Sequence, residues 1–323
     1  MLNFSHTIEC DLVHRRANSE VFVTSTDQVA EDNYRFGAQL PRWHPFFSDT
    51  DLGRQEYDPL LIIETARQGS LAVVHRYLGV PTGSQFVIRT LEFREVEQDL
   101  LAVRSVPADV VGRCRIMRRY ARGDQLTGVV VENILCRDGR PAARVEISAS
   151  WVDTDHWKVL RQRQRAERAQ HGISKPAQAH RIAPAQVGRA DPRNVVLSPA
   201  RHTDEAVVVV DTGNPTLFDH HVDHVPGMLE LEAARQHALL AFAKQDSMPE
   251  GRITAIDAQF RDIAELDLPL LSSICAEGRR TLASLTQAGR AVAEIELTWQ
   301  FEAPGSANEF TTDLIDATIG HRR

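Results

Sequence analysis

A charged pattern that occurs twice in the sequence is the feature that most limits how this chain can fold. Glu64-Thr-Ala-Arg67-Gln68 in the first half matches Glu232-Ala-Ala-Arg235-Gln236 in the second, at an offset of 168 residues. The same offset relates several other residues, namely Leu61 to Leu229, Leu71 to Leu239, Pro81 to Pro249 and Gly83 to Gly251. An internal repeat of this length predicts one fold unit that is used twice.

The length and composition fit two folded domains. The chain has 323 residues, of which 42% are hydrophobic and 25% charged, and these are ordinary values for globular proteins. Because domains of about 150 residues are common, we expect a first domain at 1–155 and a second at 200–310. Between them, at 156–199, the composition shifts to Arg, Gln, Ala, His and Pro, which is typical of a linker with helical composition only at its start. Residues 311–323 are expected to form a C-terminal tail.

The charge balance and the apolar pattern argue against several classes of protein. A formal charge of −7 disfavours nucleic-acid binding, which needs a net basic face, but a few local arginines could still hold a small anion. No segment reaches the ~18 continuous apolar residues of a membrane span, and the first residues lack the apolar core of a signal peptide. We therefore expect a cytoplasmic protein that binds neither nucleic acid nor membrane. The four cysteines are widely spaced and are expected to be reduced core thiols.

The expected secondary structure has the same order in both halves. Helices are predicted at 59–78 and 227–243, and the first is marked by Asp58 as N-cap, Pro59 at the first helical position and Gly79 beyond the end. Strands are predicted at 17–24, 34–40, 85–93, 100–106, 111–120, 126–136 and 142–151 in the first half, and at 206–211, 253–260, 273–278 and 291–301 in the second.

One long helix with an antiparallel run of strands, repeated, predicts an α+β fold in which each sheet wraps a central helix. The first helix is apolar around most of its circumference, as expected of a buried helix. On such a helix, residues three and four positions apart share a face, so Glu64, Arg67 and Gln68 form one polar stripe, and Glu232, Arg235 and Gln236 form another. A solvent-facing ion pair is the alternative interpretation. If the stripes are buried, each ion costs several kcal/mol to desolvate, and a functional site is the better explanation.

The loops before the two helices supply further candidates. Asp219-His-His-Val-Asp-His224 leads directly into the second helix, whereas His44 lies farther ahead of the first. The three histidines and two aspartates there could bind a metal, but their spacing matches no zinc signature, and histidines that cap the loop are the alternative. The free amides of Gly227 and Met228 at the helix end could stabilise a developing oxyanion.

Other catalytic motifs are absent from the sequence. It has no glycine-rich phosphate loop, no dinucleotide fingerprint and no Ser or Cys in a nucleophile-elbow context. We therefore expect no cofactor, no metal, and acid–base and electrostatic catalysis.

Three segments together resemble the A-factor synthase family, whose members build γ-butyrolactone-type signalling molecules in actinomycetes. They are Asp58-Pro-Leu-Leu-Ile-Ile-Glu64-Thr-Ala-Arg-Gln68, Asp191-Pro-Arg-Asn-Val-Val-Leu197 and His224-Val-Pro-Gly-Met-Leu-Glu-Leu-Glu232-Ala-Ala-Arg-Gln236. The resemblance implies a double hotdog fold. The third segment is also similar, more distantly, to hotdog dehydratases, but Arg235 departs from their pattern.

The resemblance also implies a reaction. A β-ketoacyl group would pass from acyl-carrier protein or a coenzyme A thioester to the hydroxyl of dihydroxyacetone phosphate or a similar C3 phosphate. Glu232 would act as general base, Arg235 would hold the phosphate or the β-keto oxygen, and Glu64 would belong to the facing half of the site. The other residues expected to bind substrate are His44, Arg67, Gln68, His224, Gly227, Met228 and Gln236.

Two other functions and one question of assembly stay open at this stage. A hotdog dehydratase or thioesterase would act on acyl thioesters without a triose phosphate, and a non-catalytic relative would bind a ligand as a regulator. A monomer and a homodimer are both compatible with the sequence. Because only the second copy carries the histidine loop directly against its helix, we expect Glu232 and Arg235 to form the main site.

Overall fold

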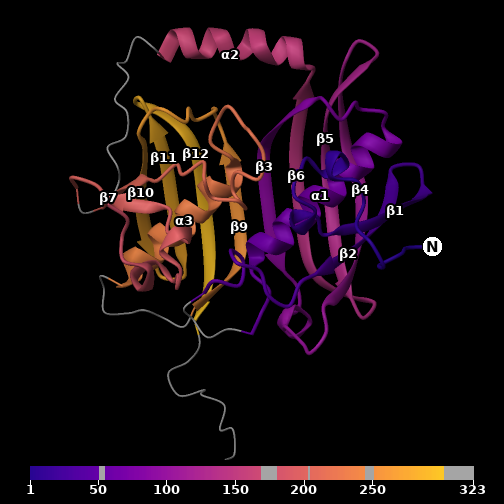
Figure 1. The fold of residues 1–323 in the computed structure, drawn as a ribbon, viewed down its shortest axis with the longest axis horizontal. Coiled ribbons are helices and arrows are strands. Elements are labelled where there is room, and N and C mark those ends of the chain that lie inside the picture. Colours follow the sequence, from indigo (N-terminus) through magenta and orange to yellow (C-terminus); the bar gives the residue numbers. More distant parts are fainter. Residues whose placement is uncertain (51–54, 169–179, 203, 244–250, 302–323) are drawn as a thin grey trace, which may run out of the picture.

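Two similar units lie side by side and share one continuous sheet (Figure 1). The computed structural model describes residues 1–50, 55–168, 180–202, 204–243 and 251–301. Within these residues the strands form a 12-stranded sheet in the order β1-β2-β4-β5-β6-β3-β9-β12-β11-β10-β8-β7. Read outward from its centre, the second half of this order repeats the first, strand for strand. The fold is therefore a double hotdog, and the duplication predicted from the sequence is confirmed.

The strands of the first unit are β1 (Val23–Ala30), β2 (Asn33–Leu40), β3 (Gln85–Glu95), β4 (Ala108–Arg122), β5 (Gln125–Arg137) and β6 (Arg140–Val152). Those of the second are β7 (Leu197–Pro199), β8 (Glu205–Val208), β9 (Gly251–Phe260), β10 (Leu270–Glu277), β11 (Arg280–Gln287) and β12 (Arg290–Phe301). Neighbouring strands of the sheet pair antiparallel.

The units join where β3 pairs with β9. Phe93 lies opposite Ile256, and Leu91 opposite Ala258, so buried apolar side chains continue across the junction. On the other face, the Arg94 guanidinium donates to the Asp257 carboxylate at 2.6 Å. The junction is thus built like the interior of either sheet.

Each unit has one long buried helix. Helix α1 (Pro59–Tyr77) begins as predicted, because the Asp58 carboxylate accepts a hydrogen bond from the Leu60 amide at 2.8 Å. Helix α3 (Gly227–Ala243) has the predicted bounds, and most of its side chains are buried. Neither helix has a broad polar side that faces solvent, because most of the residues around each helix are buried.

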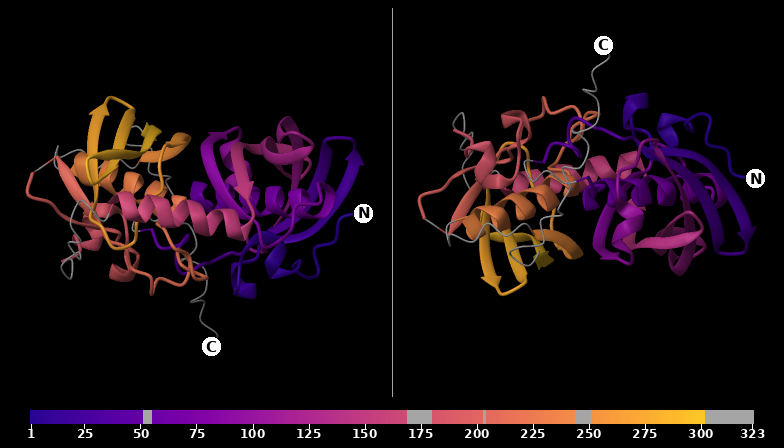
Figure 2. Two further views of the ribbon diagram at one scale, coloured as in Figure 1. Left: turned by 90° about the horizontal axis from the view of Figure 1, so that it is seen from above. Right: turned by 90° about the horizontal axis from the view of Figure 1, so that it is seen from below.

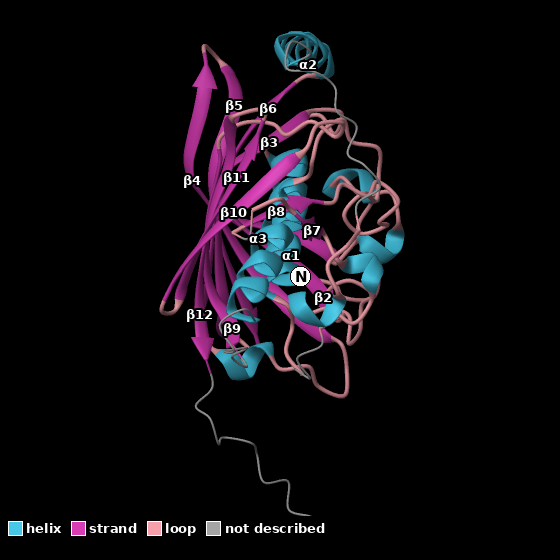
Figure 3. Ribbon diagram, turned by 90° about the vertical axis from the view of Figure 1, so that its left-hand side faces the viewer, coloured by secondary structure: helices cyan, strands magenta, loops and turns pink. Residues whose placement is uncertain are grey.

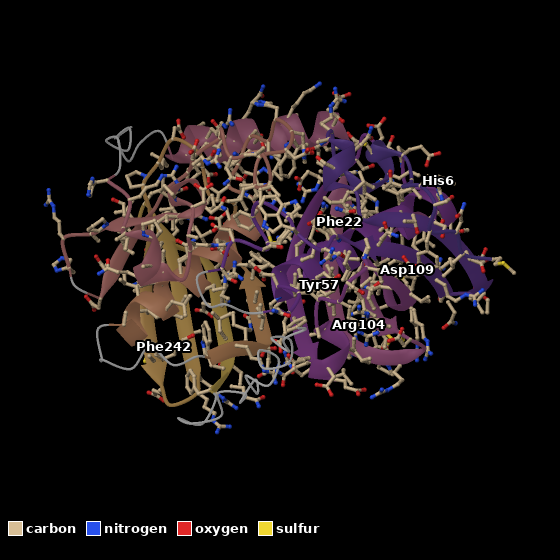
Figure 4. The ribbon with its side chains drawn as sticks, turned by 60° about the horizontal axis from the view of Figure 1, so that its bottom comes forward. His6, Phe22, Tyr57, Arg104, Asp109 and Phe242 are labelled. Atoms are coloured by element: carbon tan, nitrogen blue, oxygen red, sulfur yellow. The ribbon has the colours of Figure 1, made fainter. Side chains whose placement is uncertain are left out.

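The molecule has three layers (Figure 3), with the sheet on one side, α1 and α3 in the middle and loops on the far side. One cluster of buried apolar residues extends through both units, and it includes Phe22 and Phe242, which Figure 4 places in different halves. A separate group of buried apolar residues lies within the first unit and includes Phe36 and Trp151. Because both units contribute to one core, residues of either unit can be held rigidly against the other.

Two of the predicted strands were wrong, and one strand was not predicted. Residues 17–24 are mostly not a strand, since the short 3-10 helix Asn18–Glu20 precedes β1. At 100–106 the chain forms the 3-10 helix Gln98–Leu101 and then bonds to the loop ahead of α1, where the Tyr57 amide donates to the Leu101 carbonyl at 2.8 Å. Strand β11 was missed because its inward residues include Thr281, Ala283 and Gln287, which weaken the apolar alternation.

The segment expected to be a linker contains a longer helix than its start suggested. Helix α2 (Thr154–Arg168) crosses above both units (Figure 2). Its Arg161 donates two hydrogen bonds to the buried Glu265 carboxylate and one to the Asp223 carboxylate, so α2 is fixed to the second unit. Farther along, 3-10 helices at Pro184–Val187 and Pro192–Asn194 precede β7, which pairs with β8. Residues 169–179 and the expected tail lie outside the described residues.

Other expectations concern cysteines, membranes and metals. Cys114 and Cys136 are buried, but Cys275 is exposed, so the prediction that all four thiols lie in the core was wrong. None of the helices in the described ranges has both the length and the apolar character to cross a membrane. In the same ranges, no group of three or more metal-binding side chains comes together.

Candidate active site

The duplicated Glu-Arg-Gln stripes are buried inside the protein. Glu64 is 1% exposed, and its carboxylate accepts hydrogen bonds from Arg67 Nε and Gln68 Nε2, each at 2.7 Å. Glu232 is 0% exposed and accepts corresponding bonds from Arg235 and Gln236. The interpretation as solvent-facing ion pairs is therefore excluded for both stripes.

A second arginine completes each stripe, and the sequence did not reveal it. Arg15 donates through Nε to Glu64 at 3.0 Å, and Arg189 donates through Nε to Glu232 at 2.9 Å. Both arginines also reach the opposite unit, where Arg15 donates to the Thr216 carbonyl. We call Arg15, Glu64, Arg67 and Gln68 the first cluster. Arg189, Glu232, Arg235 and Gln236 form the second cluster.

These two arginines occupy equivalent places in the fold. Each follows a short 3-10 helix and a residue with positive φ, His14 at 53° in one case and Gly188 at 65° in the other. The sequence signal is weak, because Val13-His-Arg15 and Val187-Gly-Arg189 are 174 residues apart rather than 168. Unequal loop lengths hide this part of the repeat.

The two glutamines connect each helix to the segment that precedes the first strand of its unit. Gln68 accepts from the Phe22 amide and donates to the Glu20 carbonyl, at 2.8 and 2.7 Å. Gln236 makes the same pair of bonds with Val196 and Asn194. Since these bonds use both ends of each amide, Gln68 and Gln236 serve to hold the clusters in place.

A cavity of about 250 Å³, which we call the main cavity, lies where the two units meet. It contains five of the residues predicted from sequence, namely Glu64, Arg67, His224, Gly227 and Met228. Further polar residues at its walls are His14, Arg15, Ser70, Gln85, Thr216, His220, Glu230 and Asp262. The rest of the lining is apolar and comes largely from α1, β3, β5 and β6 of the first unit. The cavity thus has a polar end between the units and an apolar wall along the first sheet.

The N-terminal end of α3 faces this cavity. The amides of Leu229 and Glu230 donate to the Pro226 carbonyl at 2.9 and 3.3 Å. The first amides of the helix, those of Gly227 and Met228, precede this bonding pattern and remain available to a ligand. A helix end of this kind attracts negative charge.

His224 is held in one orientation beside the cavity. Its Nδ1 lies 2.9 Å from an oxygen of Asp223, and its ring meets the Trp157 ring edge-on, with centroids 5.6 Å apart. Burial alone would raise the pKa of Asp223, but hydrogen bonds from His224 and Arg161 outweigh burial and lower it. An ionised Asp223 fixes the proton of His224 on Nδ1, which leaves Nε2 as the basic nitrogen.

The other histidines near the helix have different places. His220 lines the cavity, where burial and the nearby Arg15 and Arg67 lower its pKa, whereas His221 is exposed. His44 lies away from the main cavity and caps its own loop, accepting from the Phe46 and Phe47 amides. Asn214 caps the equivalent loop of the second unit in the same way.

In the second cluster, a carboxylate from the other unit pairs with the arginine of the stripe. Arg235 Nη1 donates to the Asp58 carboxylate at 2.6 Å, beside a smaller cavity of about 70 Å³. Asp58 is the N-cap of α1, and at the 168-residue offset its counterpart is Pro226. Arg67 therefore meets no carboxylate from the end of α3. Among the described residues it donates to Glu64 and to the Val13 carbonyl.

The charges of the two clusters differ for this reason. The first has two guanidiniums and one carboxylate in contact, whereas the second, with Asp58, has two of each. Burial alone would raise the pKa of Glu64, but Arg15 and Arg67 outweigh burial and lower it to about 2. Glu64 is therefore ionised at neutral pH, so the contacting groups of the first cluster carry one net positive charge, and Glu20 and Asp219 lie near enough to Arg15 to act on it electrostatically. Arg67, at 21% exposed, is the guanidinium through which that charge is accessible.

The family model of the A-factor biosynthesis hotdog domain matches residues 2–153 and 173–302. A 2-oxo-3-(phosphooxy)propyl 3-oxoalkanoate synthase of Streptomyces virginiae is 34% identical over 265 residues, which cover 81% of this chain and 85% of that protein. The synthase of the same name from Streptomyces coelicolor is 34% identical over 80% of this chain and 78% of its own length. An acyl-ACP thioesterase structure from Bacteroides thetaiotaomicron is 10% identical and covers 84% of this chain and 98% of its own, with a TM-score of 0.49.

Proposed function

Since the chain belongs to the A-factor biosynthesis hotdog domain family, we propose that it is an acyltransferase that makes a phosphorylated 3-oxoacyl ester. The names of its Streptomyces relatives describe an ester between a 3-oxoalkanoate and a 3-phosphooxy-2-oxopropyl group. We assign this chain the same product. The donor is a 3-oxoacyl thioester of carrier protein or coenzyme A in the cytoplasm, and the acceptor is dihydroxyacetone phosphate. The ester is a precursor of butenolide-type signalling molecules.

The observation that carries the proposal is the charge difference between the two clusters. In the second copy of the motif, the arginine binds an anion, because Arg235 Nη1 donates to the Asp58 carboxylate. At the equivalent Arg67, no side chain of the described residues takes that place, and Arg67 lines the main cavity. Arg67 already donates through Nε and Nη2 to Glu64 and through Nη2 to the Val13 carbonyl, so a phosphate there would accept a charged hydrogen bond from Nη1, the atom that binds Asp58 in Arg235. We therefore assign the phosphate of the acceptor to Arg67, backed by Arg15.

The thioester carbonyl is assigned to the N-terminal end of α3. The amides of Gly227 and Met228 would donate to the oxygen that becomes negative when the hydroxyl attacks. Because these donors are fixed by the helix, they need little rearrangement during the reaction. The acyl chain then extends along the apolar wall of the first unit, where residues such as Val74 and Val129 line the cavity.

His224 is the group that we assign as general base. The hydroxyl proton of the acceptor moves to His224 Nε2 while the hydroxyl oxygen bonds to the thioester carbon. The tetrahedral oxyanion then collapses, the carbon–sulfur bond breaks, and the thiolate takes the proton from His224. The sequence suggested Glu232 as general base, but we assign His224 instead. Glu232 does not line the main cavity, and its carboxylate accepts hydrogen bonds from Arg189, Arg235 and Gln236.

The proposal is tested by mixing the purified protein with a 3-oxoacyl thioester and dihydroxyacetone phosphate. We expect release of thiol that requires the phosphate, and formation of the ester, which mass spectrometry identifies. Unphosphorylated dihydroxyacetone serves as the matched control and should not support release. Release without any acceptor would instead indicate a thioesterase, and absence of all turnover with tight thioester binding would indicate a regulator.

A further inference from the structure

Glu230 is a buried carboxyl group that the proposed reaction does not use. It is 3% exposed, it lines the main cavity, and its Oε2 has no hydrogen-bond partner among the described residues. Burial raises the pKa of Glu230 to about 8, so its carboxyl carries a proton at neutral pH. A protonated carboxyl donates one hydrogen bond and accepts others.

The helix geometry directs Glu230 toward the reacting end of the substrate. Gly227 and Glu230 are three residues apart, so they share one face of α3, and a helical side chain leans toward the N-terminus of its helix. The Glu230 carboxyl and the Gly227 amide therefore approach the same part of the cavity. Other charged or titratable groups that face this space are His14 and Arg15 from the N-terminal segment, Glu64 and Arg67 from α1, His220 and His224 from the loop, and Asp262 after β9.

A 3-oxoacyl thioester has two carbonyl oxygens that could use these two donors. The oxygens are separated by one methylene carbon between their carbonyl carbons, and in the proposed binding mode the first accepts from the amides of Gly227 and Met228. The second would then lie farther along α3, on the face that carries Glu230. A saturated acyl chain has no oxygen at that position and would leave the Glu230 carboxyl without a partner.

We infer that Glu230 selects 3-oxoacyl donors, by donating a hydrogen bond from its carboxyl to the 3-oxo oxygen. The inference rests on the proposed function and specifies the donor for the same site. Discrimination of this kind is strong when a site contains a polar group that only the correct substrate can satisfy. A buried polar group left without a partner costs about 1–3 kcal/mol, which corresponds to a preference of roughly 5-fold to 150-fold.

The test compares the ratio of kcat/KM for a 3-oxoacyl thioester to that for the saturated thioester of equal length. We expect Glu230→Leu to lower this ratio about 10-fold or more. Glu230→Gln is the matched control, because its amide keeps a donor of similar shape, and it should retain most of the preference. A ratio that Glu230→Leu leaves unchanged, or that both variants lower equally, would overturn the inference.

A binding measurement keeps this test independent of turnover. Dissociation constants of the corresponding non-reactive amide analogues, with and without the 3-oxo group, should show the same preference in the wild-type protein and its loss in Glu230→Leu. If the wild-type protein turns over no thioester, the proposed function fails while the binding ratio still decides the role of Glu230. Equal affinities of the wild-type protein for both analogues would refute the role directly. Circular dichroism checks that each variant is folded.

Discussion

Two fully buried carboxyl groups at one cavity differ in charge, and their neighbours explain the difference. Glu64 contacts two guanidiniums, which lower its pKa to about 2 against the effect of burial. Among the described residues no guanidinium forms an ion pair with Glu230, and burial raises its pKa to about 8. At neutral pH one group is an anion that holds arginines in place, and the other is a neutral hydrogen-bond donor.

The raised pKa of Glu230 predicts how stability depends on pH. Between pH 4.5 and about 8 the folded protein holds a proton on Glu230 that the unfolded chain has lost, so unfolding releases a proton. Raising the pH through this window therefore favours unfolding, on the order of a few kcal/mol, and the effect ends above the folded pKa. Glu230→Gln should lack this contribution. Chemical denaturation at several pH values should show that the variant gains stability over the wild-type protein as the pH rises.

A gap between the two proteins that stays constant from pH 5 to 8 would contradict a protonated Glu230. The same reasoning predicts that Glu230→Leu is at least as stable as the wild-type protein at pH 7, since an apolar side chain has no unsatisfied polar atom there. The protein thus keeps a residue that lowers its stability, as functional sites often do.

A second prediction at the residue scale concerns His224. His224→Gln should lower kcat about 10²-fold to 10⁴-fold, the usual contribution of a general base. His221→Gln is the matched control, because His221 is an exposed neighbour outside the cavity. Steady-state thiol release measures both variants. Equal rates for the two would remove His224 from the reaction.

At the scale of elements, the ends of the two helices make the duplicated units unequal. Asp58 caps α1 and also binds Arg235, whereas α3 begins after Pro226, which has no side-chain acceptor. One position in the repeat therefore decides which cluster faces an open cavity. The two clusters are otherwise built alike. Each contains an arginine from a loop that precedes the helix, and a glutamine that bonds to the segment before the first strand of its unit.

The double role of Asp58 leads to a further prediction. Asp58→Asn keeps an oxygen to cap α1 but removes the negative charge beside Arg235. The variant should lose about 3–5 kcal/mol of stability, because breaking a buried ion pair leaves a charge without its partner. Inorganic phosphate should raise the melting temperature of this variant more than that of the wild-type protein, since an anion in the small cavity beside Arg235 would balance the charge that Asp58 no longer neutralises. Thermal unfolding at increasing phosphate concentration measures the difference, and equal stabilisation of the two proteins would refute this view of the second cluster.

Local signals predicted some elements from the sequence and not others. The start of α1 was predicted correctly because Asp58 and Pro59 are local signals, and α3 because its apolar run is long. Residues 100–106 were assigned wrongly because their amides bond to a loop more than 40 residues away in the chain, which no local pattern reports. Helix α2 is stabilised largely by Arg161 and its distant carboxylate partners, so its full length was not evident either.

At the scale of the whole molecule, the cavity exists because the two units meet. A site shared by the two units was predicted from the sequence, but not all of the residues that line it. Glu64, Arg67, His224 and Gly227 were predicted as site residues, and they do line one cavity. Arg15 was missed because its repeat partner is displaced by loop insertions. Glu230 was missed because one carboxyl in a helix near its N-terminus looks ordinary until its burial is known. The emphasis on Glu232 and Arg235 followed from the adjacent histidine loop, but that loop faces the cluster of the other unit.

The central claim is that one of the two clusters is the active one, and a matched pair of variants tests it most directly. Arg67→Gln and Arg235→Gln make the same change at equivalent positions of the repeat. Phosphate-dependent thiol release should fall at least about 100-fold in Arg67→Gln, mainly through a higher KM for dihydroxyacetone phosphate, because a charged hydrogen bond to phosphate is lost. The folded fraction of Arg235→Gln should keep near-normal kcat/KM despite lower stability. Loss of activity in Arg235→Gln with retention in Arg67→Gln would contradict the account.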